Sequence, residues 1–224
     1  ALLSQDPYFI KAFKEGKDIH SAVAMKVFGV KEEDVTSDMR RRAKIINFGM
    51  LYGMGVNALR QNIGTDRKDA QIFYDNYFAQ FPNIVAYLES IKNFAKEHGY
   101  TETLFGRKRY FPGIRSSIPF IKAMAERMAI NAPIQGTATA DIIKIGMKNV
   151  EDDLKKAGIL GDTRLLLQVH DELVYEIKEN KLKEAMKIIE GAMKNAIPKE
   201  FLTDLDPVPL EVSSSYGRTW GDLK

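Results

Sequence analysis

The chain has 224 residues, of which 45% are apolar, and its 33 basic and 30 acidic side chains leave a formal net charge of +3. This length and composition predict a globular protein that can bury a core, as one domain or two small ones. The sequence has no cysteine, which excludes disulfides and thiolate metal sites, and it has no leader or apolar run of membrane-spanning length, so we expect a soluble, cytoplasmic protein without a membrane partner.

The first residues predict two short helices with marked starts. Asp6 and Pro7 are typical of a helix start. A second helix should begin at Asp18 and stop before Gly29. It carries His20 in its first turn, where a histidine is most often a surface or capping residue. The local pattern alone therefore assigns His20 no role.

A third helix carries a stripe of basic and aromatic residues. The capping residues at 36–38 should start it and Gly53 should end it. A spacing of four residues places four side chains on one helical face, namely Arg40, Lys44, Phe48 and Tyr52. A nucleoside triphosphate would suit both the cationic and the aromatic half of this stripe. A solvated basic face beside two core aromatics explains it equally well.

Further helices are predicted at residues 55–63, 66–80 and 84–99, which completes an all-helical part. The helix at 66–80 should bury one face, made of Ile72, Phe73, Tyr77 and Phe78. The pattern then changes to a small hairpin at residues 100–111. Its tip is basic, with Arg107, Lys108 and Arg109. Such a tip is most often a solvated turn, although it offers phosphate donors beside stacking surfaces.

A long helix is predicted from residue 117, with a kink at Pro133 and a continuation to residue 157. One of its faces carries three polar side chains at intervals of four: Arg127, Asn131 and Gln135. A solvated face is the ordinary explanation. The alternative is that these groups bind hydrogen-bond acceptors in a DNA minor groove, which are placed similarly for every base pair.

A second hairpin is predicted from two buried, β-favouring runs at residues 164–169 and 173–177. The turn between them contains His170, Asp171 and Glu172. This turn is either a polar, solvent-facing loop or a site for a hard cation such as Mg²⁺, which prefers carboxylate oxygens. A helix at 181–196 and a last strand at 209–212 should follow. The expected fold class is α+β, with a mostly helical part followed by a small antiparallel sheet and packing helices.

Several of these segments resemble motifs of the family A, bacterial DNA polymerase I-like DNA polymerases. Residues 40–53 match the pattern Arg-x-x-x-Lys-x-x-x-Phe-Gly-x-x-Tyr-Gly of motif B, and residues 167–172, Leu-Gln-Val-His-Asp-Glu, resemble motif C. Residues 126–137 fit Glu-Arg-x-x-x-Asn-x-Pro-x-Gln-Gly-Thr, and residues 104–109 fit Leu-Phe-Gly-Arg-x-Arg. The tail ends in the family's Gly-x-x-Trp at 217–220, where the tryptophan would be an anchor. The resemblance covers nearly the whole chain.

The resemblance implies template-directed DNA synthesis, in which a nucleotide passes from a dNTP to a primer 3′-OH by a two-metal mechanism with Mg²⁺. Residues 1–116 would be the fingers, with the basic hairpin near their end, and residues 117–224 would be part of the palm. The protein would act in DNA replication or repair and associate with the nucleoid.

The resemblance also implies roles for individual residues. His20, Arg40 and Lys44 would bind the triphosphate of the dNTP, Phe48 would pack on its sugar and base, and Tyr52 would occupy the templating position. Asp171 would bind metal, with Glu172 supporting the site, and Lys44 would assist catalysis. The DNA-binding set would be Arg127, Asn131, Gln135 and His170 together with the basic tip, Arg107, Lys108 and Arg109.

One departure from the family pattern limits these expectations. Motif A, an Asp-Tyr-Ser-Gln-Ile-Glu-Leu-Arg segment that supplies the second metal-binding aspartate, is not in this sequence. We therefore expect the chain to be inactive alone and to need three partners: primer-template DNA, dNTPs and an upstream part of the same polymerase with motif A, a thumb and a possible exonuclease domain. A single-subunit RNA polymerase-like enzyme and a non-catalytic nucleic-acid-binding module remain alternatives.

Overall fold

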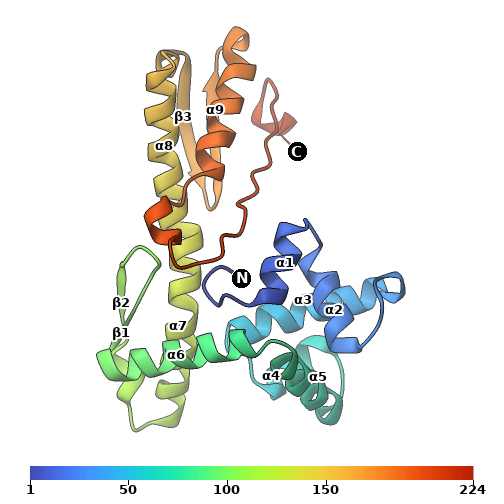
Figure 1. Ribbon diagram of the computed structural model, residues 1–224. Coiled ribbons are helices and arrows are strands. Elements are labelled where there is room, and N and C mark those ends of the chain that lie inside the picture. Colours follow the sequence, from blue (N-terminus) through green and yellow to red (C-terminus); the bar gives the residue numbers. More distant parts are fainter. Residues whose placement is uncertain (224) are drawn as a thin grey trace. The chain divides into compact units, whose positions relative to one another are not determined.

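The computed structural model of the chain describes residues 1–223 (Figure 1). It is mostly helical and has two small antiparallel hairpins, so the expected α+β class is confirmed. No helix in this range is long and apolar enough to cross a membrane. The chain forms two compact units, Ala1–Gln135 with Asp204–Val208, and Gly136–Thr203 with Pro209 onward. The fingers and palm division at residue 116 stays a prediction, because compactness does not define functional subdomains.

The first three helices of the first unit begin at capping residues that the sequence indicates. Asp6 accepts hydrogen bonds from the backbone N–H groups of Tyr8 and Phe9 at 3.1 and 3.2 Å. Thr36 Oγ1 accepts one from the N–H of Met39 at 3.2 Å. Each cap satisfies a donor that the first helical turn leaves free. The helices of this unit are α1 (Pro7–Lys14), α2 (Ile19–Phe28), α3 (Ser37–Leu51), α4 (Val56–Ile63), α5 (Arg67–Gln80), α6 (Pro82–His98) and α7 (Pro119–Gln135).

The core of the first unit lies on the side of α3 opposite the basic and aromatic stripe. Ile46 and Met50 of α3 are buried and pack in one cluster with Tyr77 and Phe81. The Tyr77 hydroxyl donates to Oδ1 of buried Asn47 at 2.8 Å, which satisfies both polar groups inside the core. The predicted buried face of α5 is wrong at Ile72, which is 46% exposed. Only Tyr77 of that predicted set is fully buried, because the buried face of α5 is narrower than its apolar stripe.

The first hairpin pairs β1 (Tyr100–Glu102) with β2 (Lys108–Tyr110). Gly106, with φ of +80°, turns the chain between them. Thr101 of β1 is buried, and its hydroxyl donates to the backbone carbonyl of Ala129 at 3.4 Å. That carbonyl would normally bind the N–H four residues later, but this residue is Pro133, which has none. The hairpin therefore compensates for the proline inside α7.

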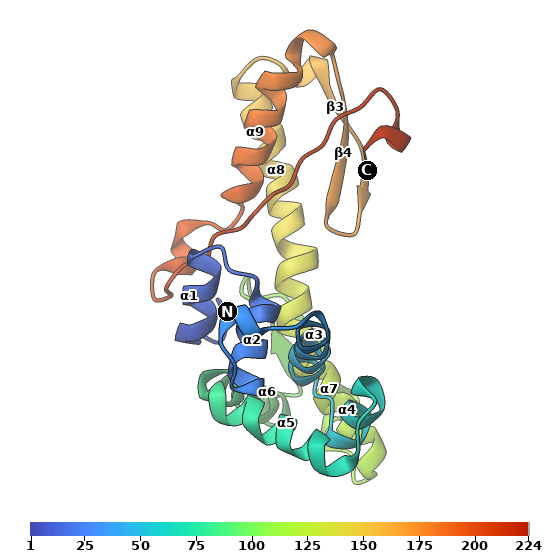
Figure 2. The ribbon, with the colours of Figure 1, turned by 90° about the vertical axis from the view of Figure 1, so that its right-hand side faces the viewer.

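The second unit contains a hairpin beside two helices (Figures 1 and 2). A π-helical segment, Gly136–Asp141, precedes α8 (Ile142–Lys156), and α9 (Leu182–Lys194) follows the hairpin. Strands β3 (Thr163–Val169) and β4 (Glu172–Ile177) pair antiparallel, with a bulge between Leu165 and Leu167. Val150 and Leu154 of α8 and Ala185 and Ala192 of α9 form the core, against which side chains of β4 pack.

Three expectations for the second unit are wrong. The strands are not buried, because Leu165, Leu166 and Leu167 are 40%, 54% and 42% exposed. Residues 209–212 form no strand within the described part of the chain, since no neighbouring strand hydrogen-bonds to them. Trp220 is not an anchor, because 60% of it is exposed. All three predictions required a neighbouring segment to cover or pair with these residues. A local sequence pattern does not show whether such a neighbour is present.

Candidate functional site

The predicted stripe is a continuous exposed face of α3. The two aromatic rings near its C-terminal end stack, with the centroids of Phe48 and Tyr52 6.3 Å apart and their planes at 14°. They are 42% and 38% exposed, although a soluble helix would ordinarily bury such rings. Lys44 and Arg40 are exposed one and two turns before Phe48. The structure therefore excludes the reading in which the two rings belong to the core.

His20 lies next to this stripe, although it comes from α2. Its ring is 5.5 Å from the ring of Phe48, centroid to centroid. Its Nδ1 is buried without a hydrogen-bond partner in the described structure. Burial lowers the pKa of His20 below its ordinary value, and the nearby charges of Arg40 and Lys44 lower it further, while Asp18 opposes them. The family resemblance predicts a role for His20, whereas the sequence pattern around it does not.

Arg40 is held by an ion pair that the sequence did not indicate. Its Nε donates to Oδ2 of Asp18 at 2.8 Å, and its second terminal nitrogen donates to Oδ1 at 2.9 Å. The same carboxylate accepts from the N–H and the hydroxyl of Ser21 at 2.8 and 2.7 Å. These hydrogen bonds, first of all those of Arg40, hold the pKa of Asp18 far below its usual range. The sequence identified Asp18 only as the start of α2.

The structure explains why glycine occupies positions 49 and 53 of the 40–53 motif. A Cβ added to Gly49 would lie 2.8 Å from the sulfur of Met54. Gly53 has φ of +70°, and its Cβ would lie 3.0 Å from Cγ of Arg127 on α7. The N–H groups of Gly53 and Met54 bind the carbonyls of Met50 and Gly49, the pattern of a Schellman C-cap. The end of the stripe is thereby placed against the polar face of α7.

The polar face of α7 is partly exposed. Arg127 and Gln135 are exposed and Asn131 is half-buried. Oδ1 of Asn131 is buried without a hydrogen-bond partner in the described structure, which is unusual for an amide oxygen. Glu126, beside Arg127, forms an ion pair with Lys96 of α6 at 3.0 Å. On a fully solvated face, water would reach the amide oxygen of Asn131. The face is therefore partly buried at this residue.

The basic tip of the first hairpin is exposed, but its side chains are not all available. The Lys108 ammonium lies 4.4 Å from the ring centroid of Tyr100 and 3.4 Å from a carboxylate oxygen of Glu102. Arg109 lies over the ring of Phe111 at 5.6 Å. Arg107, at the turn, has an exposed side chain. The tip therefore offers cations that are already placed on aromatic faces.

The predicted metal-binding turn lies in the second unit. His170 and Asp171 form a two-residue turn between Val169 and Glu172, with φ of His170 at +54°. The Gln168 side chain donates to the carbonyl of His170 at 3.2 Å and braces the turn. Asp171 and Glu172 are both exposed. Residues 1–223 contain no group of three or more side chains able to hold a metal ion, so the metal role of the turn stays a prediction.

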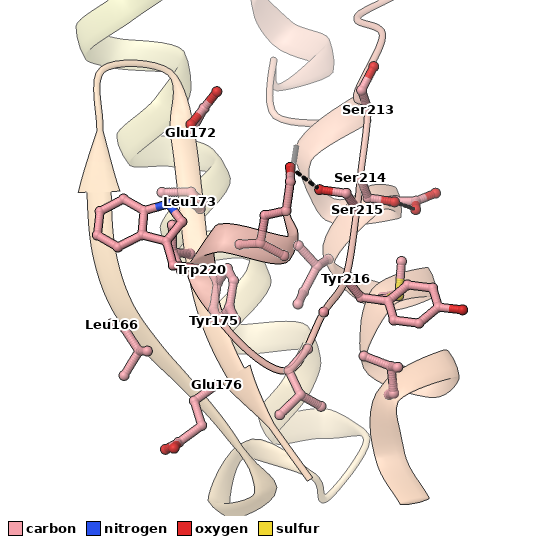
Figure 3. A pocket seen from close by; sticks show the side chains of 18 of the residues that line it. Leu166, Glu172, Leu173, Tyr175, Glu176, Ser213, Ser214, Ser215, Tyr216 and Trp220 are labelled. Carbon is pink, nitrogen blue, oxygen red and sulfur yellow. Dashed lines mark hydrogen bonds between the residues drawn. The ribbon is translucent and has the colours of Figure 1, made fainter. Parts of the chain in front are cut away.

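An open groove runs along β4 in this unit (Figure 3). The hairpin, the extended chain at residues 211–217 and three apolar residues of α9 line it, namely Met186, Ile189 and Met193. Asp171 and Glu172 are among the lining residues. Tyr216 points away from the strands in Figure 3 and is 68% exposed. The acidic turn therefore borders a groove that apolar side chains of α9 also line.

Known proteins resemble the whole chain. The model of DNA polymerase family A matches residues 1–222. The chain belongs to DNA polymerase family A. DNA polymerase I of Pseudomonas aeruginosa is 45% identical over 99% of the chain, and the thermostable DNA polymerase I of Thermus filiformis is 44% identical over 100%. The expected family is thus confirmed.

A solved structure of the same family has the same fold. The POL domain of Pol1 from M. smegmatis, in complex with DNA primer-template and dNTP, matches with a TM-score of 0.89 and 42% identity over 100% of this chain and 38% of that one. The chain spans 23% and 26% of the two family A relatives named above, about a quarter of their length. Family membership therefore does not by itself carry the activity of the whole relatives over to this chain.

Proposed function

We propose that this chain is the nucleotide-binding and partial catalytic portion of a DNA polymerase, which adds dNTPs to a primer 3′-OH under the direction of a template. The observation that carries the proposal is the exposed face of α3, where Arg40, Lys44 and two stacked aromatic rings follow one another beside His20. Cations suit the triphosphate and rings suit the sugar and base. Family membership agrees with this assignment.

The roles within this site follow from chemistry. Arg40 and Lys44 would bind phosphate oxygens, and His20 would add a proton-bearing donor when a polyanion raises its pKa. Phe48 would pack on the incoming nucleotide, and Tyr52, at the C-cap of α3, would occupy the templating position. Arg127, Asn131, Gln135 and His170, with the tip of the first hairpin, would contact DNA; the exposure of Arg127 and Gln135 on one face of α7 supports this.

The acidic turn fits one part of a magnesium site. Asp171 would hold Mg²⁺ and Glu172 would support it, because hard cations take carboxylate oxygens. Bound Mg²⁺ would lower the pKa of the primer 3′-OH and stabilise the leaving pyrophosphate. The described residues provide no further carboxylate beside this pair. A second ion would therefore need an aspartate from an upstream part of the polymerase.

The test is primer extension with Mg²⁺ by the full-length protein that carries this chain. Asp171→Asn should abolish extension while primer-template binding persists. Glu176→Gln, which removes an exposed carboxylate at the other end of β4, is the matched control and should leave extension within about twofold. Extension by Asp171→Asn at the parent's rate would contradict the assignment, and DNA binding without extension by the parent would indicate a non-catalytic module.

A further inference from the structure

Among the residues that the structure describes, Asp18 is the one carboxylate that pairs with the cationic half of the α3 stripe. It binds Arg40 through both oxygens, at 2.8 and 2.9 Å, and is itself fixed by Ser21. The pair uses two of the five N–H donors of the guanidinium and leaves the outer donors for another acceptor. The two hydrogen bonds thereby fix the orientation of the Arg40 guanidinium.

Stability does not account for this pair. The side chains of Arg40 and Asp18 are 48% and 40% exposed, and exposed ion pairs contribute little to folding. The other basic side chains at the start of α3 are paired within the helix, as Arg41 is with Asp38 at 2.6 Å. Within residues 1–223, Arg40 is the basic side chain of α3 that pairs outside its own helix, with Asp18 at the N-cap of α2, the helix that also carries His20. Asp18 thus fixes the Arg40 side chain relative to His20, which is also a candidate to bind phosphate.

We propose that Asp18 is a positioning residue, which holds the guanidinium of Arg40 so that its outer N–H groups bind the triphosphate beside Lys44 and His20. The inference rests on the proposed function. Immobilising a long side chain in advance removes an entropy cost from binding.

The opposite role, in which Asp18 competes with phosphate for Arg40, predicts the opposite result. If the carboxylate were a competitor, its neutralisation would release Arg40 and tighten nucleotide binding. If it positions Arg40, the same change leaves the guanidinium mobile and weakens binding. One substitution therefore separates the two roles. Asp18→Asn suits this purpose, because asparagine also caps helices well and α2 should keep its start.

The experiment measures dNTP binding to the full-length protein on a primer-template whose primer ends in a dideoxynucleotide, so that no incorporation follows. Asp18→Asn should raise the Kd about fivefold, and in single-nucleotide incorporation on an ordinary primer it should raise KM with little change in kcat. Arg40→Lys keeps the charge but loses the two-pronged contact, and should weaken binding similarly. Asp38→Asn removes an exposed carboxylate from the first turn of α3 and should leave the Kd unchanged.

A double substitution shows whether Asp18 acts through Arg40. All variants of this cycle also carry His20→Gln, because the charge of Asp18 acts on the pKa of His20 as well. In this background Asp18→Asn should add nothing to the effect of Arg40→Ala, because the residue to be positioned is gone. Additive losses, or an Asp18→Asn variant that binds dNTP as tightly as the parent or tighter, would overturn the positioning role. If Arg40→Ala itself leaves dNTP binding unchanged, the triphosphate assignment of the proposed function fails, and the inference fails with it.

Discussion

Lys44 is the residue of the stripe with the simplest predicted role. It is exposed on α3 between Arg40 and Phe48 and close enough to His20 to lower the pKa of that ring. We expect Lys44→Ala to reduce kcat/KM for dNTPs, because a charge-assisted phosphate contact is lost. The reduction should correspond to a loss of about 2 to 4 kcal/mol of transition-state stabilisation. Primer-template affinity should not change. Unaltered kcat/KM in single-nucleotide incorporation would remove Lys44 from the site.

His20 predicts a pH dependence of nucleotide binding. Burial lowers its pKa in the free protein and so favours the neutral ring, whereas a bound triphosphate should raise the pKa by favouring the protonated form. Binding must then take up a proton, and the dNTP Kd should fall as pH is lowered from 8 towards 6.5. Titration calorimetry in two buffers of different ionisation enthalpy measures the uptake. The His20→Gln variant should show a smaller uptake, and an uptake equal to the parent's would contradict the contact.

At the scale of elements, Gly53 at the end of α3 carries a prediction about stability. Its φ of +70° and the 3.0 Å between its ideal Cβ and Arg127 Cγ both oppose a side chain. Gly53→Ala should destabilise the protein by about 1 to 2 kcal/mol and lower Tm.

Gly191→Ala is the comparison variant for Gly53→Ala. This glycine lies inside α9 with open space at its Cβ, so alanine should stabilise by about 0.5 to 1 kcal/mol. Equal shifts of Tm in the two variants would be inconsistent with this explanation.

The helices and their caps could be predicted because their signals are local. Asp6, Asp18 and Thr36 each accept a hydrogen bond from a backbone N–H within three residues. The compensation of Pro133 by Thr101 could not be predicted, since it joins residues that are far apart in the sequence. The π-helical segment that follows was missed too. At the site, the stripe on α3 followed from spacing, whereas its contact with Asp18 required the fold.

At the scale of the whole molecule, the chain alone should bind DNA weakly and should not extend a primer. Binding persists because the exposed Arg127 and Arg107 remain. Extension fails because Asp171 and Glu172 are the only acidic pair at the turn, and two Mg²⁺ ions about 4 Å apart need more negative charge. A primer-extension assay with Mg²⁺ tests this, first on the chain and then with an upstream segment added, which should restore activity. Extension by the chain alone that Asp171→Asn abolishes would contradict the prediction and point to Glu172 as a substitute.

The exposure of the β3 and β4 hairpin has a consequence for amide hydrogen exchange. Each strand pairs only with the other among the described residues, and two-stranded sheets are marginally stable. Amides of β3 and β4 should therefore exchange with deuterium faster than those in the buried middle of α3. The carboxylate expected to bind metal would then be carried by an element that opens often. An added upstream segment should slow exchange in the hairpin if it completes the sheet, and that protection can be measured without any nucleotide.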